Sequence, residues 1–504
     1  MTADLPRRLG AAAPFAVYPA GAIVLLVLHL WVASGISPFA AVRGLVVALV
    51  VGIALSALGT AILRDRHRGG LLGLLMVLLV VAGGRPGVAP ILLLPAILLV
   101  IDRYGPRHTS LDWAWVGKLV GRVTVILAIA VLLEAIQFGR FGDLVAAVQG
   151  ETPMRSGPVK PPPADAPDVY VILLDGYARA DVLSERFGLD ISPFLDGLGT
   201  RGFDVATDSH SNYIVTNLSL SSFLNFRHLA DIAALKPLID DPGATEGPHV
   251  HRAISQAAVL TEFRSLGYQT VGISSGFEQA AVRSADAFVD NGELNEFEIQ
   301  LLRPAVIPPL LTAAVPDAFS ANQRQRIESV FEAVETLAAQ PSSRPRFVFA
   351  HVPSPHGPWV SRADGSPRVV MSLETWYFDT PETTGLGRAE VVKGYVDQTV
   401  YLDGRVLRAV ETILAKSTRP PVILVVSDHG SSLDVGNANV ESRLRILFAA
   451  HTPGHEALFA DDVSLVGVFP TLFDAYYGVQ LPRPAETLYT GGPRGLWDPV
   501  AVNQ

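Results

Sequence analysis

The sequence predicts an α/β protein anchored in a membrane: a bundle of about five transmembrane helices, followed by a sheet packed between two layers of helices. Three observations predict this fold class. Apolar runs fill residues 14–138, the net charge changes sign near residue 141, and the remainder alternates apolar strand-like runs with helical patterns. At 504 residues, 49% hydrophobic and 17% charged, the chain is more apolar than an ordinary soluble enzyme. Its length leaves room for two or three domains.

The N-terminal part contains five apolar segments that could cross a membrane. They are residues 14–34, 39–62, 70–84, 87–101 and 116–138. The first, second and fifth reach the roughly 20 residues that a bilayer requires. The third and fourth are shorter and are separated by GGRPG, so they form either two thin or tilted spans or a re-entrant hairpin. Both alternatives return the chain to the same side of the membrane.

The basic residues indicate how this bundle is oriented. Residues 1–141 carry a net charge of +7 and the rest of the chain −16. With the N-terminus inside, only Arg43, Arg85 and Arg140 lie at the outer ends of the spans. The inner ends carry Arg7, Arg8, Arg64, Arg66, Arg68, Arg103, Arg107, Lys118 and Arg122. This asymmetry follows the positive-inside rule, so we expect a multi-pass protein of the cell (inner) membrane whose later residues face the extracytoplasmic side. A cleaved signal peptide does not explain several successive spans.

The composition divides the chain into four parts. Residues 1–141 are the predicted transmembrane domain, and residues 142–166 a Pro-rich linker that suits a semi-rigid spacer. Residues 167–490 are the predicted catalytic domain, and residues 491–504 a C-terminal tail. The acidic balance after residue 141 argues against nucleic acid as a partner, because nucleic-acid binding needs a basic surface.

Four apolar runs in the catalytic domain are predicted strands: residues 168–175, 268–275, 346–352 and 422–428. Their almost continuous apolar character is typical of strands buried on both faces of a largely parallel sheet. Helical patterns such as residues 391–415 lie between them. This alternation predicts an α/β sandwich.

Three of these strands end on side chains that can bind metals. The first ends at Asp175, the third places His351 at its end and His356 in the following loop, and the fourth leads into Asp428 and His429. Because sites in open α/β sheets lie at the carboxyl ends of the strands, these side chains could converge. A single aspartate that ends a strand is more often a turn former. Two carboxylates and an imidazole together suit a divalent cation such as Zn²⁺ or Mn²⁺.

A nucleophile could come from the segment SHSNYIVTNLSLSSFLNF, where a helical pattern begins near Thr216. A hydroxyl at a helix start lies among backbone N–H groups that stabilise an anion, and a metal would lower its pKa. Spacing alone favours the alternative that this threonine only caps the helix. A second metal pair, His249 and His251, lies in what reads as a Gly/Pro-flanked loop, and a site there is the weaker interpretation.

The order of these motifs resembles the alkaline phosphatase–sulfatase superfamily. The resemblance covers roughly residues 167–482 and is carried by DVYVILLDGYARADVL, the Thr before NLSLSSFLN, SLGYQTVGISSG, AHVPSPHGPW, VVSDHG and SLVGVFPTLFDAYYGVQLP. Five membrane spans before such a domain are similar to lipoteichoic acid synthases and phosphoethanolamine transferases. The resemblance implies the α/β/α sandwich of this superfamily.

The resemblance also implies roles for individual residues. Thr216 would be both the nucleophile and a metal ligand, and the other metal ligands would be Asp175, Asp428 and His429. His356 would contact the substrate phosphate. His351 has no counterpart in the pattern and reads as a structural neighbour of the site.

Two further side chains are substrate-binding candidates. Ser275 lies in the segment where the synthase-like transferases carry a substrate-contacting histidine. Arg443 follows Asp428 and His429 closely in the chain and could face the site, although a structural ion pair also explains it.

The departures from the pattern restrict the chemistry. The transferases commonly carry Glu at the position of Asp175, and the two-zinc members use an additional Asp-x-x-x-His pair that this chain lacks, so a single Mn²⁺ or Zn²⁺ is expected. True sulfatases need Cys or Ser in a Cys/Ser-x-Pro/Ala-x-Arg signature. The chain contains no cysteine and no serine in that setting near the helix start. Classical sulfate-ester hydrolysis is therefore not expected.

The expected function is a phosphotransferase that moves a phosphorylated head group from a membrane lipid to an envelope glycan or lipid acceptor, through a phospho-threonine. A phosphodiesterase, phosphatase or sulfatase-like hydrolase would share the first step and is the main alternative. An inert envelope-binding homologue is the second alternative. A transporter is disfavoured because Glu134, near the outer end of its span, is the main acidic residue within the spans.

Overall fold

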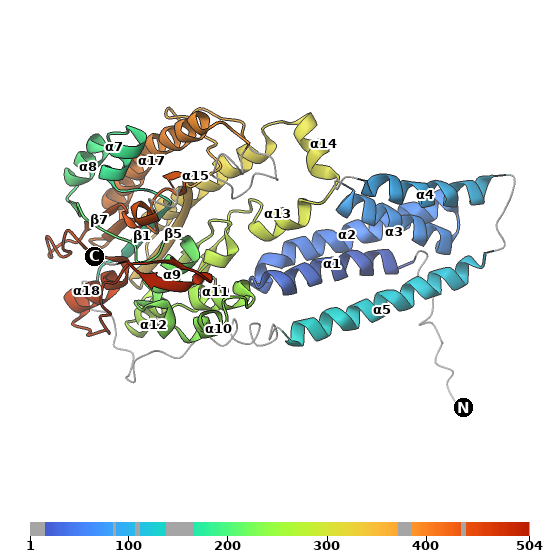
Figure 1. The fold of residues 1–504 in the computed structure, drawn as a ribbon, viewed down its shortest axis with the longest axis horizontal. Helices are drawn as coiled ribbons and strands as arrows, with labels where there is room; N and C mark the ends of the chain where they lie inside the picture. The colour runs from blue at the N-terminus through green and yellow to red at the C-terminus, as the bar shows by residue number, and fades with distance from the viewer. Residues whose placement is uncertain are drawn as a thin grey trace. The chain divides into compact units, whose positions relative to one another are not determined.

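The computed structural model describes residues 16–83, 87–105, 111–137, 166–370, 385–434 and 440–502. The chain divides into two compact units, which we describe separately (Figure 1). The first comprises residues 1–34, 38–141 and 297–314, and the second comprises residues 35–37, 142–296 and 315–504.

The first unit begins with five apolar helices, each at a predicted span. They are α1 (Tyr18–Ser34), α2 (Pro38–Leu63), α3 (Arg66–Ala82), α4 (Val88–Tyr104) and α5 (Trp113–Gln137). Among the described residues, α2 and α5 are long and apolar enough to cross a membrane. The other three helices have 17 residues each. The number of complete spans therefore stays a prediction.

Small residues allow the N-terminal helices to approach one another closely. A Cβ added to Gly59 of α2 would lie 2.3 Å from the carbonyl oxygen of Gly69 in α3, and one on Gly52 would lie 2.5 Å from Cα of Ala20 in α1. Close backbone approach at small residues is typical of helices that pack within membranes. The side chain of Asp65 caps α3 by accepting hydrogen bonds from the first-turn amides.

The first unit also contains a segment that lies far away in the sequence. Residues 297–314 carry most of α13 (Glu296–Leu302) and all of α14 (Ile307–Ala314). The sequence analysis assigned these residues to the catalytic domain, because eight-residue apolar runs give no spanning signal.

The second unit is built around a seven-stranded sheet with the order β2-β7-β6-β1-β5-β3-β4. The strands are β1 (Val169–Asp175), β2 (Asp204–Val205), β3 (Gln269–Ile273), β4 (Ala287–Val289), β5 (Arg346–Pro355), β6 (Val422–Ser427) and β7 (Phe448–His451). The four predicted strands are β1, β3, β5 and β6, and they are mutually parallel with β4. Strand β7 pairs antiparallel with both β6 and β2. The prediction of a largely parallel sheet is confirmed.

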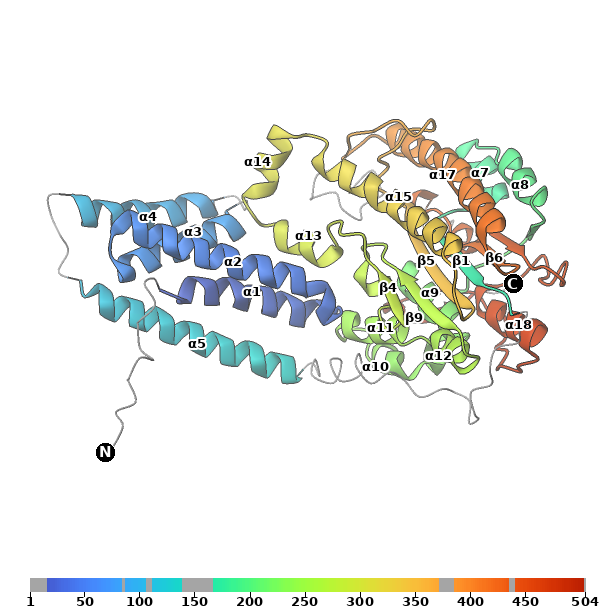
Figure 2. The same cartoon turned by 180° about the vertical axis from the view of Figure 1, so that it is seen from behind.

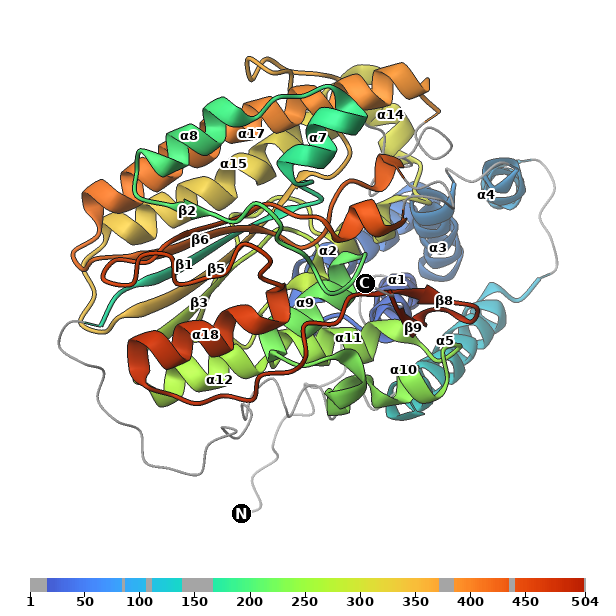
Figure 3. The same ribbon diagram turned by 60° about the vertical axis from the view of Figure 1, so that its left-hand side comes forward.

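Two layers of helices cover the sheet (Figures 2 and 3). One layer contains α7 (Ala180–Phe187), α8 (Ser192–Gly199), α15 (Ala318–Ala339) and α17 (Arg388–Lys416). The other contains α9 (Thr216–Asn225), α11 (Glu246–Ser255), α12 (Ala258–Ser265) and α18 (Leu465–Tyr477). Alternate side chains of β1 enter the two cores between these layers, and all of them are fully buried up to Leu174. A strand buried on both faces explains the continuous apolar run VYVILL.

Two local predictions differ from the structure. His249 and His251 lie on helix α11 and not in a loop; residues two apart on a helix point in nearly opposite directions, and the His249 ring bonds the Ala234 carbonyl oxygen. Much of the expected tail, residues 491–504, forms a hairpin of β8 (Tyr489–Gly492) and β9 (Gly495–Ala501). The predicted linker, residues 142–166, lies outside the described residues except for its last position.

Candidate metal centre

The site begins where three neighbouring strands end. Strand β1 lies between β5 and β6, and its penultimate residue, Leu174, is in register with Ser427 of β6. Asp175 at the end of β1 therefore lies beside Asp428, which directly follows β6. This edge is where open α/β sheets place their ligands.

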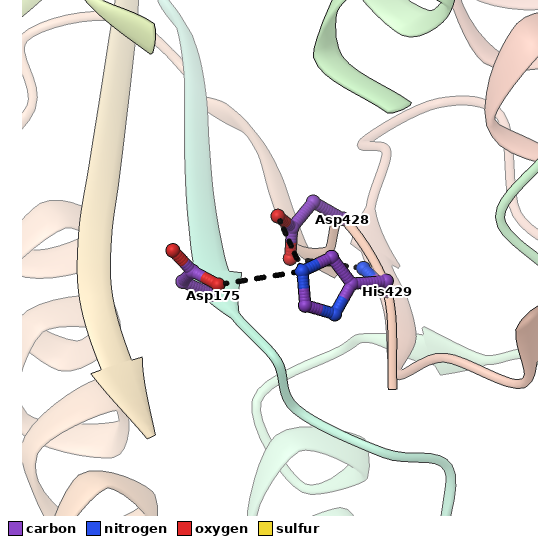
Figure 4. Close-up of side chains that lie close together, drawn as sticks. All are labelled: Asp175, Asp428 and His429. Carbon is purple, nitrogen blue, oxygen red and sulfur yellow. Dashed lines mark hydrogen bonds and ion pairs between the residues drawn. The ribbon is translucent and has the colours of Figure 1, made fainter. Parts of the chain in front are cut away.

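Asp175, Asp428 and His429 form one tight cluster (Figure 4). Their potential ligand atoms all lie within 4.8 Å of one another. The His429 Nε2 atom is 3.7 Å from Asp175 Oδ1 and 3.5 Å from Asp428 Oδ2. All three side chains are buried. The structure thus brings together segments that are more than 250 residues apart in the sequence.

The backbone holds the Asp428 carboxylate in place. Its Oδ1 atom accepts hydrogen bonds from the amides of Gly176 at 3.1 Å and His429 at 2.9 Å. Its buried Oδ2 atom has no hydrogen-bond partner within the described chain. One oxygen therefore fixes the side chain, and the other is available to a ligand in the cluster.

The hydrogen bonds of His429 define its tautomer. Nδ1 lies 2.7 Å from the carbonyl oxygen of Gly430, which can only accept, so Nδ1 carries the proton. Burial lowers the pKa of His429, opposed by Asp428 and reinforced by the Arg443 guanidinium. The ring is therefore neutral, with the Nε2 lone pair directed at the cluster. A neutral imidazole is the form that binds metals.

These donor atoms fit a divalent cation. Asp175 Oδ1, Asp428 Oδ2 and His429 Nε2 are three acceptors that face one another, and both oxygens lack hydrogen-bond partners in the described part of the chain. Burial raises the pKa of Asp175, but the imidazoles of His356 and His351 outweigh it and hold the pKa below its usual range. A buried, ionised acceptor cluster is costly unless a cation neutralises it.

Thr216 is placed to join this cluster. It is the first residue of α9, and its Oγ1 atom lies 3.1 Å from His429 Nε2. The N-cap residue is Val215, so the interpretation of Thr216 as the cap of this helix is wrong. The hydroxyl contacts His429 of the acceptor cluster, and it belongs to the first turn of a helix, whose amides have no partners within the helix.

A cavity of about 370 Å³ opens above the cluster. Four residues singled out in the sequence analysis line it: Asp175, Thr216, Ser275 and His356. Their roles stay predictions. The His356 amide donates to the Asp175 carbonyl oxygen at 2.8 Å, which ties this loop to β1. The His356 ring donates from Nδ1 to the Gly357 carbonyl oxygen at 2.9 Å, so Nε2 is the nitrogen that can exchange protons with a substrate oxygen.

Two other predicted neighbours lie behind this lining. His351, at 1% exposure, places Nε2 3.3 Å from Asp175 Oδ2 and so supports the carboxylate. The Arg443 guanidinium lies 3.5 Å from Nδ1 of His429, on the ring edge away from Thr216. Arg443 is not among the described residues that line the cavity. Its role as a substrate ligand stays a prediction.

The sequence analysis missed three polar residues of the cavity: Asn217, Glu246 and Gln323. The Asn217 side chain donates to Glu246 at 2.9 Å and to Gln279 at 2.8 Å. Asn217 could have been inferred because it directly follows Thr216. Glu246 and Gln323 come from the starts of α11 and α15 and belong to no motif that marks them.

The sequence profile of the sulfatase family matches residues 167–474, which is more than half of the chain and includes every residue of the cluster. The chain belongs to the sulfatase family. It is thereby a member of the alkaline phosphatase–sulfatase superfamily, and an enzyme of the kind that transfers or hydrolyses phosphoryl or sulfuryl groups. No curated protein matches this sulfatase-family chain.

The chain is similar to several solved structures. The periplasmic domain of EptC from Escherichia coli is 14% identical, with 67% of this chain and 94% of that one covered and a TM-score of 0.43. The integral membrane lipooligosaccharide phosphoethanolamine transferase EptA from Neisseria meningitidis is 13% identical (90% and 83% covered, TM-score 0.38). The phosphonate monoester hydrolase of Agrobacterium radiobacter is 12% identical (62% and 73% covered, TM-score 0.40).

Proposed function

We propose that this sulfatase-family enzyme is a membrane-anchored, metal-dependent phosphotransferase. It moves a phosphorylated head group from a lipid to an envelope glycan or lipid, through a phospho-threonine. The observation that supports the proposal most is the 3.1 Å contact between Thr216 Oγ1 and the His429 nitrogen, within a buried Asp/Asp/His cluster at the base of a cavity. A family member built for formylglycine chemistry would need a Cys or Ser there, and this position is threonine.

The residues of the site support a reaction in two steps. With its hydroxyl proton already lost to solvent, the Thr216 oxygen attacks phosphorus and displaces the lipid alcohol, whose oxygen takes a proton from protonated His356. An acceptor hydroxyl then returns a proton to His356, attacks phosphorus and releases Thr216 as the alkoxide. A cation held by Asp175, Asp428, His429 and Thr216 would lower the pKa of the threonine hydroxyl and neutralise charge on the transferred group. Two carboxylates, an imidazole and a hydroxyl suit a single Mn²⁺ or Zn²⁺.

The N-terminal helices support a lipid donor. We place α1–α5 across the cell membrane with residues 142–504 on the extracytoplasmic side, as the distribution of basic residues indicates. This arrangement would hold the catalytic unit beside the lipid head groups. It raises the local concentration of a lipid donor without any further binding site.

Donor labelling tests the proposal directly. The full-length enzyme, supplied with Mn²⁺ or Zn²⁺, is mixed with phospholipid labelled in the head group and with envelope glycan and lipid fractions. We expect the label to move to a glycan or lipid product. Label released only as a water-soluble phosphate ester would identify a hydrolase instead. No turnover by a metal-loaded enzyme across phospholipid and envelope donors would favour the inert binding homologue.

We expect Glu246 to favour a donor lipid whose head group carries an amine. Apart from Asp175, Glu246 is the only acidic residue that lines the described cavity, and its carboxylate is partly buried. We expect Glu246→Gln to lower kcat/KM for an amine-bearing lipid about tenfold, the effect of losing one charged hydrogen bond. Activity toward a glycerol head group should stay unchanged, since Gln keeps the oxygen that accepts from Asn217. Glu411→Gln, on the exposed face of α17, is the matched control. Equal loss for both donors would contradict this selectivity.

A further inference from the structure

Helix α14 exposes apolar side chains that the catalytic chemistry does not explain. Ile307, Leu310 and Leu311 of this helix are between 37% and 64% exposed, and Val315, which directly follows the helix, is 50% exposed. No acidic or basic residue occurs between Arg303 and Asp317. Four exposed large apolar residues therefore gather within nine positions, on and directly after one short helix. Such a gathered apolar surface marks an interaction site.

The segment that carries α14 is fixed to one end of the N-terminal bundle. The buried carboxylate of Glu298 in α13 forms an ion pair with Arg43, in the first turns of α2. The Val306 amide donates to the carbonyl oxygen of Val80, near the end of α3, at 3.0 Å. The start of α2 and the end of α3 are the ends that the basic residues assign to the outer face. The segment therefore joins the bundle at its outer end.

The exposed apolar surface of α14 is part of the same unit as the outward-facing side chains of α2 and α5. Those helices expose Val46, Val50, Ile126 and Leu133 along surfaces that a bilayer would cover. An eight-residue helix is about 12 Å long and cannot cross a membrane. It can lie at the interface with its apolar face among the acyl chains.

The backbone of α14 suits a site with little water. Pro308 and Pro309 occupy its first turn, where they remove two of the amides that would otherwise lack a partner. Unpaired amides are costly in an apolar environment. The start of α14 therefore brings fewer unpaired N–H donors into an apolar environment than an ordinary helix start would.

We propose that α14 is an interfacial helix whose side chains at positions 307, 310 and 311, together with Val315 directly after its end, insert into the outer leaflet of the bilayer. The partner is a lipid surface, and the inserted helix is a second point of membrane attachment, supplied from within the catalytic sequence. This inference rests on the proposed membrane placement of α1–α5. It does not depend on the phosphotransferase chemistry.

Because the chain contains no cysteine, a single introduced cysteine can be labelled without removing any native one. Full-length Leu310→Cys, Ile126→Cys and Val400→Cys are labelled with an environment-sensitive fluorophore in vesicles of phosphatidylethanolamine and phosphatidylglycerol. We expect blue-shifted emission at position 310, quenched more by lipids with a shallow doxyl group than by lipids with a deep one. Position 126 of α5 should be quenched more by deep groups, and position 400 of α17 by neither.

Any other result would overturn the inference, and the possible results can be told apart. If position 310 behaves like position 400 while position 126 is quenched, α14 does not insert although the bundle spans the membrane. If position 126 is also unquenched, the proposed membrane placement fails together with the inference. A nitroxide label at Ile307→Cys, compared for collisions with oxygen and with a water-soluble nickel chelate, guards against an effect of the fluorophore. Greater access for nickel there would contradict insertion.

Discussion

Thr216→Ala is expected to remove turnover almost completely, by at least about 10⁴-fold in kcat, as found when a nucleophile that forms a covalent intermediate is deleted. The physical reason is the position of the Thr216 hydroxyl. It lies 3.1 Å from the unprotonated nitrogen of His429, which is itself 3.7 Å from Asp175 and 3.5 Å from Asp428. The measurement is single-turnover transfer of labelled head group by the full-length enzyme.

The folded state should tolerate this change, because Thr216 makes no cap bond to α9. Near-wild-type Tm and circular dichroism would establish that point. Thr216→Ser should keep partial activity, since it keeps the hydroxyl. Thr412→Ala is a matched control, because that hydroxyl bonds only within α17 at Arg408.

Mass spectrometry of the wild-type enzyme after donor addition should locate phosphate on Thr216. Full activity of Thr216→Ala would disprove the covalent role.

How far the sequence predicts this site depends on which part of the site is considered. The strand ends were predictable, because continuous apolar runs identify buried parallel strands and such strands share a carboxyl edge. Asp175, Asp428 and His429 follow from that argument, and the structure brings them together. Whether they bind a metal in the protein stays a prediction.

The rest of the cavity depends on packing between elements that are distant in the sequence. Glu246 opens a helix whose Gly, Pro and His residues gave it the pattern of a loop, and tertiary packing overrode that local signal. The α13–α14 segment was equally hidden. Its contacts with the N-terminal helices include the ion pair of Arg43 with the buried carboxylate of Glu298, 255 residues away, and the hydrogen bond from Val306 to Val80. No periodicity in the sequence encodes such a pairing.

Asp428→Asn is expected to abolish metal binding, and this is the second large effect that we predict. In wild-type enzyme stripped with chelator, adding Mn²⁺ or Zn²⁺ at about one hundred times its Kd should stabilise the fold by about 2.7 kcal/mol and raise Tm. Asp428→Asn should abolish this rise, because Oδ2 of Asp428 is the oxygen directed into the cluster. Activity should fall with the metal content measured by inductively coupled plasma mass spectrometry.

The metal-free Asp428→Asn variant should be at least as stable as metal-free wild type, and this sign separates a metal ligand from a structural carboxylate. Asparagine keeps the oxygen that accepts from the amides of Gly176 and His429. Its amide nitrogen can donate where the native oxygen faces two other acceptors, so an unfavourable buried contact becomes a hydrogen bond. Asp474→Asn, an exposed partner of Arg483, is the control and should alter neither metal content nor the metal-dependent rise in Tm. A metal-free Asp428→Asn protein that melts well below metal-free wild type would mean that Asp428 holds the two strand ends together by itself, without any ion.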